Sequence, residues 1–446
     1  MKKIFIFVSL LTFLFTVEIQ ANNYVWIHGL NDDSYCWKVY NEAFTAGIGT
    51  KVDYSCRYYT LPQIANSVWY GNYLSNKPNM ILIGHSMGGL VARELDATHA
   101  GNIKGIITIG TPHQGAPIET QLANGGVRQL AGKVYDKVTK SIKCSIVCRG
   151  GILGAPVGAV TWIGATILAN SLKEKALDNV MGSMESRNQP CEGDIKPGST
   201  YMNTIASRKV NVPILCFAAQ EDRWALARLA YCSDSAHHAN LQRDASLNAT
   251  GTYDQAGYNM MQAAVTTGYV LGSIHAGIAG ALIGGGWWNP YMWYLSGLNG
   301  VASYNWFSTS YYLENGLDYD HAVLVGDCGY EQRTVCYTKY ICDNTALPYE
   351  PLGRQNIAAV PDCNINTSST VTECHNVIVS VPVGNDGIVS TYTQLLDKTK
   401  GTNVIWGTSI IKGVNHMEEF NHKNTKAEFK KAIKDGGYGP TFYRGY

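Results

Sequence analysis

Gly84-His85-Ser86-Met87-Gly88 lies between an apolar run at residues 80–83 and a helix-like run at residues 90–95. This order predicts a strand, a sharp turn and a helix, with Ser86 at the tip of the turn. Flanking glycines permit such a tight turn, which raises the serine hydroxyl above the edge of a sheet. A pentapeptide of this kind arises easily by chance in a chain with 46 glycines. The assignment of Ser86 as a nucleophile therefore depends on the predicted strand and helix around it. Ser86 is therefore the candidate nucleophile, and the alternative is a glycine-rich turn with an ordinary capping serine.

A second apolar run, residues 24–27, leads into His28-Gly29-Leu30. Backbone N–H groups directly after such a strand can face the nucleophile and bind a developing oxyanion, together with the N–H of the residue after the serine. We therefore expect the N–H groups of Leu30 and Met87 to form an oxyanion hole. The side chain of His28 is expected to brace this loop.

The partners of such a serine follow it along the chain, first the acid and then the histidine. Asp386 lies in a glycine-flanked loop, and His416 lies in a loop after the apolar run 404–411. We expect His416 to be the general base and Asp386 the acid that orients it. Asp222, which follows another apolar run, is the alternative acid. Five further histidines are interpreted as loop, turn or core residues: His113, His237, His238, His275 and His321.

Apolar runs that alternate with helix-like runs predict an α/β protein with a mostly parallel sheet covered on both faces. The expected strands are residues 24–27, 80–83, 104–109, 212–218, 376–383 and 404–411, and helices are expected at 63–76 and 425–433. The expected organisation is a leader at 1–21, a core at 22–125, an insertion or lid at 126–205, a core strand region at 206–222, a cap insertion at 223–375 and the rest of the core at 376–446.

Five segments in this order resemble the secreted bacterial triacylglycerol lipases of the α/β-hydrolase fold. They are Ile27-His28-Gly29-Leu30, Gly84 to Leu90, Thr108 to Gly115, Asn385 to Ser390 and Asn415 to Glu419. The resemblance covers less than half of the chain. It implies an α/β-hydrolase fold with Ser86 as nucleophile, Asp386 as acid, His416 as base, and Leu30 and Met87 as oxyanion donors.

The resemblance also implies a structural calcium, held in those lipases by an acidic residue two positions after the histidine. Glu418 occupies that position here. His422 and Lys426 stand where further oxygen ligands would be required, so the sequence departs from the pattern there. No cofactor is required for hydrolysis by a serine and a histidine.

The first 21 residues predict export. Lys2-Lys3 precede an apolar stretch that ends in Ile19-Gln20-Ala21, which is typical of a signal peptide, so we expect a secreted protein, extracellular or periplasmic. All 12 cysteines follow this segment, and an even number in an oxidising destination favours disulfides. Cys36 with Cys56 is one candidate pair, and Cys144 with Cys148 is another, for which zinc binding is the alternative.

The residues between Asp254 and Glu314 carry no charged side chain. Glycines recur at nearly helical spacing through residues 263–283, and Trp287, Trp288 and Trp293 follow. Three interpretations remain open: a buried cap helix, a lid over Ser86 that meets lipid, and a transmembrane segment.

These features favour a secreted hydrolase of lipid or acylglycerol esters that works through an acyl-enzyme intermediate. A net charge of +1 argues against a nucleic-acid partner. A phospholipase or an acyltransferase with the same residues is an alternative. A hydrolase fold that serves without catalysis as a surface or membrane-binding protein is another.

Overall fold

The computed structural model describes residues 22–151, 189–221, 223–225, 252–286, 289–342, 368–382, 384–396, 405–420 and 422–444. The expected signal peptide and the alternative acid Asp222 lie outside these residues. The chain divides into two compact units. One comprises Met1–Asp327 with Val383–Tyr446, and the other is Cys328–Pro382.

The first unit is built on a sheet of six strands in the order β2-β1-β3-β4-β5-β8, every neighbouring pair parallel. The strands are β1 Asn23–Ile27, β2 Thr50–Val52, β3 Met80–His85, β4 Ile103–Ile109, β5 Ile214–Gln220 and β8 Ile405–Lys412. Parallel strands are covered on both faces, which explains why β3 and β5 read as continuous apolar runs rather than as alternating ones.

Helices cover this sheet: α2 Lys38–Thr45, α3 Leu61–Gly71, α4 Met87–His99, α5 Pro117–Ala123, α8 Pro190–Asp194, α9 Thr200–Ser207 and α15 Lys423–Ile433, with short 3₁₀ turns η1 Ser34–Trp37, η2 Leu74–Asn76 and η3 Ala100–Asn102. One hydrophobic cluster joins α3, α4 and α9 through Leu61, Leu90 and Met202. The other joins α2 and α15 through Phe44 and Phe429. The predicted α/β-hydrolase fold with a parallel core is confirmed.

The expected core strand at residues 376–383 is wrong. These residues belong largely to β7 Ser368–Pro382, which pairs antiparallel with β6 Cys328–Cys342 to form the second unit. An alternating apolar pattern is typical of antiparallel strands with one covered face, whereas a buried parallel strand is apolar throughout. The three-residue edge strand β2 was not predicted, because so short a run carries no periodic signal.

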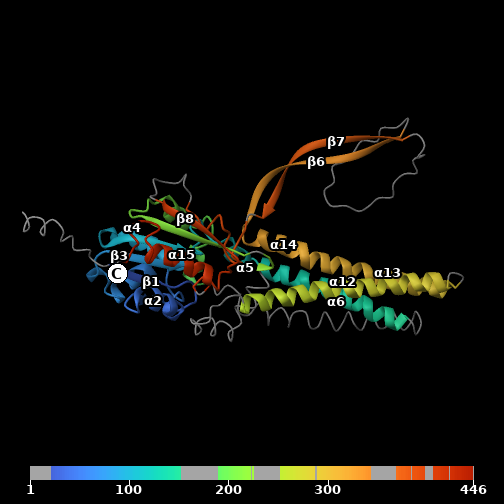
Figure 1. Ribbon diagram of the computed structural model, residues 1–446, viewed down its shortest axis with the longest axis horizontal. Coiled ribbons are helices and arrows are strands. Elements are labelled where there is room, and N and C mark those ends of the chain that lie inside the picture. The colour runs from blue at the N-terminus through green and yellow to red at the C-terminus, as the bar shows by residue number, and fades with distance from the viewer. Residues whose placement is uncertain are drawn as a thin grey trace, which may run out of the picture. The chain divides into compact units, whose positions relative to one another are not determined.

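Apart from β6 and β7, the described residues of the two insertions are mainly helical. They contain α6 Gly126–Gly151, α12 Thr252–Gly286 and α13 Pro290–Tyr311, followed by the π-helical turn η4 Tyr312–Gly316 and α14 Leu317–Leu324. Helices α12 and α13 lie side by side, and α6 packs along α13 (Figure 1). Helices α8 and α9, which the sequence analysis assigned to the insertion at 126–205, instead contribute Cys191 and Met202 to the core.

A third hydrophobic cluster connects the helical insertion to the core. It includes Ile118 of α5, Val265 of α12 and Leu317 of α14 around the buried Trp224. The indole N–H of Trp224 donates to the carbonyl of Leu313 at 2.8 Å. The expected role of residues 255–313 as a cap over Ser86 stays a prediction.

Strand β3 and helix α4 approach each other so closely at the turn that side chains are excluded there. A Cβ atom on Gly84 would lie 2.4 Å from the backbone nitrogen of Gly89, and one on Gly88 would lie 2.3 Å from the carbonyl oxygen of His28. Backbone atoms cannot give way as the end of a flexible side chain can.

We therefore expect Gly84→Ala to lower the free energy of unfolding by about 1–3 kcal/mol, the usual cost of overpacking a tight site. The matched control is Gly71→Ala, because a Cβ there has no neighbour within 4 Å. Chemical denaturation of both variants measures the difference. Equal stability of the two would contradict the close packing at the turn.

Candidate active site

Ser86 sits in a strained backbone conformation between β3 and α4. Its φ is 53° and its ψ is −130°, a combination that residues with a side chain rarely adopt. The N–H of Ser86 donates to the carbonyl of Ile109 at 2.9 Å, which extends the pairing of β3 with β4 through the serine. This geometry is that of a nucleophile elbow, with the hydroxyl at the carboxyl end of the sheet.

The structure brings the three residues expected at this site into one hydrogen-bonded chain. Nε2 of His416 lies 2.9 Å from Oγ of Ser86, and Nδ1 of His416 lies 2.8 Å from Oδ2 of Asp386. The backbone N–H of His416 also donates to the carbonyl of Asp386 at 2.8 Å. Two loops far apart in the sequence are thereby held together at one end of the sheet.

The carboxylate of Asp386 is fully buried and accepts four hydrogen bonds. Oδ1 accepts from the N–H groups of Ile388 and Val389 at 2.9 and 2.7 Å, and Oδ2 accepts from His416 and from Nε2 of Gln394 at 3.0 Å. Burial raises the pKa of Asp386 to about 6, against the opposing charge of His416. The four donors all favour the ionised form.

Gln394 is a site residue that the sequence analysis missed. Its Nε2 reaches Asp386, while its Oε1 accepts from the N–H of Ala219 in β5 at 2.7 Å. The buried amide thus connects the acid loop to the sheet. A glutamine in a polar segment gives no periodic or motif signal from which this position could be predicted.

Two side chains that precede the second unit support the acid loop. Oδ2 of Asp327 accepts from the N–H of Gly384 and from Nδ2 of Asn385, both at 2.9 Å. Nε2 of His321 lies 2.9 Å from the carbonyl of Gly387, and burial lowers the pKa of His321 to about 4. A neutral imidazole with its N–H on that carbonyl suits this contact. His321 is a core histidine as expected, and it also holds the backbone beside Asp386.

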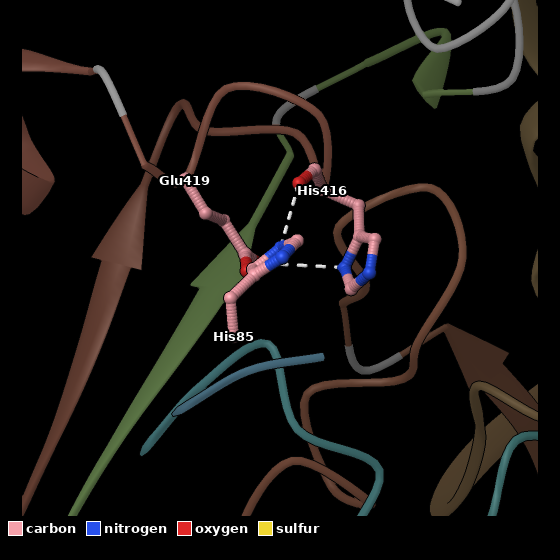
Figure 2. Close-up of side chains that lie close together, drawn as sticks. All are labelled: His85, His416 and Glu419. Carbon is pink, nitrogen blue, oxygen red and sulfur yellow. Dashed lines mark hydrogen bonds and ion pairs between the residues drawn. The ribbon is translucent and has the colours of Figure 1, made fainter. Parts of the chain in front are cut away.

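Glu419 places a second buried carboxylate beside His416 (Figure 2). Its Oε2 lies 3.0 Å from Nε2 of His85, and its Oε1 lies 3.6 Å from Nδ1 of His416. Nε2 of His85 also lies 3.1 Å from the carbonyl of His416. The carboxylate rests against Gly110, where a Cβ atom would lie 2.0 Å from Oε2. Only a glycine at position 110 leaves room for Glu419.

The two carboxylates set the charge of the imidazole between them. Burial disfavours the imidazolium, but Asp386 and Glu419 outweigh burial and raise the pKa of His416 to about 10. For Glu419, burial favours the neutral form, but the neighbouring His416 and His85 hold the pKa down to about 2. The site therefore binds a proton on His416 strongly.

His85, His416 and Glu419 could each offer one ligand atom to a metal ion, since these atoms lie within 4.8 Å of one another. Both ring nitrogens of His416 are already engaged, one by Ser86 and one by Asp386, so a metal ion would have to displace one of these contacts. We interpret the cluster as a network of buried ion pairs. The calcium implied by the resemblance stays a prediction, from which the sequence departs because the side chains of His422 and Lys426 carry nitrogen where oxygen ligands are expected.

The expected oxyanion donors border the serine. Met87 is the first residue of α4, and the N–H groups in the first turn of a helix have no acceptor within the helix. Gly29 runs directly past the serine, because a Cβ there would lie 2.9 Å from Cβ of Ser86, and Leu30 follows it. His28 braces this loop: its ring stacks on Tyr54 at 4.0 Å between centroids, and its Nδ1 lies 2.8 Å from the carbonyl of Gly29.

The candidate disulfides of the sequence analysis do not form in the structure. Cys36 and Cys56 are free and belong to different hydrophobic clusters. Cys144 and Cys148 are also free, since residues four apart on α6 hold their Cβ atoms about 5–6 Å apart, beyond the reach of a disulfide. The thiol of Cys191 instead lies 3.4 Å from the carbonyl of Cys56.

The N-terminal part of the core is similar to a known protein family. Residues 32–154 match the family described as PGAP1-like alpha/beta domain, which is less than half of the chain. No functionally curated protein matches the sequence.

Solved structures resemble the chain at low identity. An extracellular α/β-hydrolase from a Paenibacillus species is 16% identical, with a TM-score of 0.24, over 43% of this chain and 76% of that one. The mature lipase BlEst2 of Bacillus licheniformis is 14% identical, with a TM-score of 0.26, over 46% of this chain and 67% of that one. Phospholipase PlaB of Legionella pneumophila is 12% identical, with a TM-score of 0.28, over 48% of this chain and 40% of that one. The fold of this chain is assigned from the order of the strands in its sheet and from the turn at Ser86. No activity of these proteins is attributed to this chain.

The electrostatics of the site predict the titration of His416. NMR of histidine-labelled protein should show His416 titrating well above the ordinary histidine range, as its raised pKa requires. Glu419→Gln removes a neighbouring negative charge, which destabilises the imidazolium and should lower this pKa by about one unit or more. The control is Glu428→Gln on α15. An unchanged pKa in Glu419→Gln would show that Glu419 does not act on His416.

Proposed function

We propose that the chain is a serine hydrolase of carboxylic esters, with Ser86 as nucleophile, His416 as general base and Asp386 as the acid that orients it. The observation that carries the proposal is the chain of contacts from Oγ of Ser86 through both nitrogens of His416 to Asp386, at a strained elbow beside a helix N-terminus. A serine, a histidine and a carboxylate in these positions are the components of nucleophilic acyl transfer.

The reaction proceeds in two halves. His416 accepts the hydroxyl proton as Oγ of Ser86 attacks the ester carbonyl, and the N–H groups of Leu30 and Met87 stabilise the oxyanion. The tetrahedral intermediate expels the alcohol, which takes the proton from His416, and leaves an acyl-enzyme. A water molecule, deprotonated by His416, then attacks the acyl-enzyme, and the carboxylic acid departs as Ser86 recovers its proton.

The second carboxylate has a role in this cycle. As Ser86 gives up its proton, the imidazole becomes positive, and both Asp386 and Glu419 stabilise that charge. The same charges hold a proton on resting His416 at neutral pH. Activity should therefore rise with pH as the base form of His416 becomes populated.

The substrate class we propose is lipid or acylglycerol esters, supported by the apolar insertions and by the lipase-like segments of the sequence. Export, inferred from residues 1–21, would place the enzyme outside the cytoplasm. A phospholipase or acyltransferase using the same residues is the alternative, and capture of the acyl group by added alcohols distinguishes transfer from hydrolysis. A non-catalytic protein would not be labelled at Ser86 by a fluorophosphonate.

Removal of the nucleophile or the base tests the proposal. Ser86→Ala and His416→Ala should each lower the rate of p-nitrophenyl ester hydrolysis by about 10³-fold or more, without loss of folded protein by circular dichroism. Thr98→Ala, on the distal end of α4, is the control. Near-normal turnover by either variant would overturn the assignment.

The identity of the acid is tested separately. Asp386→Asn should reduce ester hydrolysis far more than Asp222→Asn, because only the residue bonded to Nδ1 holds the imidazole in the productive tautomer. The comparison is made on kcat under identical conditions. A larger loss in Asp222→Asn would assign the acid to the end of β5.

A further inference from the structure

The hairpin of α12 and α13 exposes an apolar surface that the described protein does not cover. Residues 255–313 carry no charged side chain, and Met261–Gly284 is long and apolar enough to cross a membrane. Only 17% of that stretch is buried. The core helix of a soluble protein with this composition would be mostly buried.

The hairpin is polar inside and apolar outside. His275 of α12 connects three helices, because its Nδ1 lies 2.8 Å from Oδ1 of Asn299 on α13 and its Nε2 lies 2.9 Å from Oγ of Ser145 on α6. Val270 and Ile274, one turn apart on α12, are 52% and 51% exposed, and Ile278 continues the same stripe. Water-soluble helix bundles show the opposite arrangement, whereas helices in lipid turn their polar groups inward.

A basic cavity of about 800 Å³ lies between α6 and α13. Arg128, Lys133, Lys137 and Lys140 line it, with Asp136 as the one acidic lining residue. Partial burial, together with Lys133 and Lys140, lowers the pKa of Lys137, as expected where positive charges crowd. Lys133 forms an ion pair with Asp320, so Lys137 and Lys140 carry most of the excess positive charge, and such an excess suits anionic phosphate groups.

The position of this cavity along the hairpin matches a membrane surface. On α13 it is lined by Tyr304, Asn305, Ser308 and Thr309, and Tyr304 and Tyr311 are 71% and 65% exposed. Exposed tyrosines are typical of the boundary between lipid and water. From Pro290 to Ser303, α13 extends about 21 Å beyond this level, less than the roughly 30 Å of a bilayer's hydrocarbon core.

We propose that the hairpin of α12 and α13, together with the end of α6 that packs on it, inserts from one side into an anionic lipid bilayer, with the basic cavity between α6 and α13 binding lipid phosphate groups at its surface. The inference goes beyond the proposed function, because it locates the protein and requires no reaction. With the hairpin inserted, the protein would bind an ester substrate at the membrane.

Vesicle flotation with full-length Ser86→Ala protein tests the inference, since that variant leaves the lipid intact. We expect binding to vesicles of phosphatidylcholine with 30% phosphatidylglycerol that persists in ~1 M NaCl, because salt screens charges but not apolar insertion. Ile274→Asp with Ile278→Asp should abolish binding. Ile48→Asp is the matched control, because Ile48 is exposed on the core, away from the hairpin.

Charge variants test the cavity. Lys137→Gln with Lys140→Gln should weaken binding to the anionic vesicles by about 10-fold or more, at roughly 5-fold for each charge removed near a membrane surface. Lys423→Gln with Lys434→Gln, at exposed positions at the start of α15 and directly after its end, should bind as the parent does. Equal binding by the cavity variant and this control would overturn the role of the cavity.

Three further results would overturn insertion: no binding by the parent protein, complete release by salt, or normal binding by the aspartate variant. A dimer by light scattering that the aspartate variant loses, without vesicle binding, would assign the apolar face to a second copy of the chain. Hydrolysis of a soluble p-nitrophenyl ester by the aspartate variant with Ser86 restored should stay unchanged, which separates this inference from the proposed function.

Discussion

The backbone strain at Ser86 is the constraint on which the site depends. A residue with a side chain holds φ at 53° only if its surroundings supply compensating contacts. Here β3 enters the turn paired with β4, and α4 leaves it packed against the end of β1 through Gly88. The serine hydroxyl and the first N–H groups of α4 consequently emerge at the same point. The strain and the orientation of the nucleophile have the same cause.

The charged groups next to Ser86 form a buried network in which carboxylates and imidazoles contact one another. The attraction between one buried carboxylate and one imidazole would barely offset the free-energy cost of burying both charges. Here each charge has several partners. Asp386 accepts four hydrogen bonds, and Glu419 lies between two imidazoles. Supporting contacts come from Gln394, His321 and Asp327, so the acid loop is held by the sheet and by the segment that follows α14.

The helical insertion distributes its polar and apolar side chains differently from the core. In the core, apolar side chains form the buried clusters on the two faces of the sheet. In the helical insertion, His275 of α12 is bonded to Asn299 of α13 and to Ser145 of α6, and valine and isoleucine side chains of the hairpin face outward. The two regions meet around Trp224.

Local patterns in the sequence determined the elements near the serine. Apolar runs predicted β1, β3, β4, β5 and β8, and the signal is strongest in the central strands β3 and β5, because buried parallel strands are apolar on both faces. The glycine-flanked Ser86 predicted the turn, because its local geometry depends on adjacent residues alone. Chain order singled out Asp386 and His416, and in the structure His416 contacts Ser86 on one side and Asp386 on the other.

Only the tertiary structure decided which distant groups meet. Residues 376–382 pair with β6, an outcome that depends on a partner strand and not on their own pattern. Gln394 lies in a turn and His321 on α14, and folding brings both to the loop of Asp386, although nothing in their neighbouring residues marks them. Glu419 belongs to a segment that the sequence marked, but its contacts with His85 and His416 depend on the fold. Cys56 lies beside Cys191 rather than pairing with Cys36 because residues 135 apart are brought together by folding. A local sequence pattern indicates which secondary structure a segment forms, whereas contacts between segments depend on the packing of the whole chain.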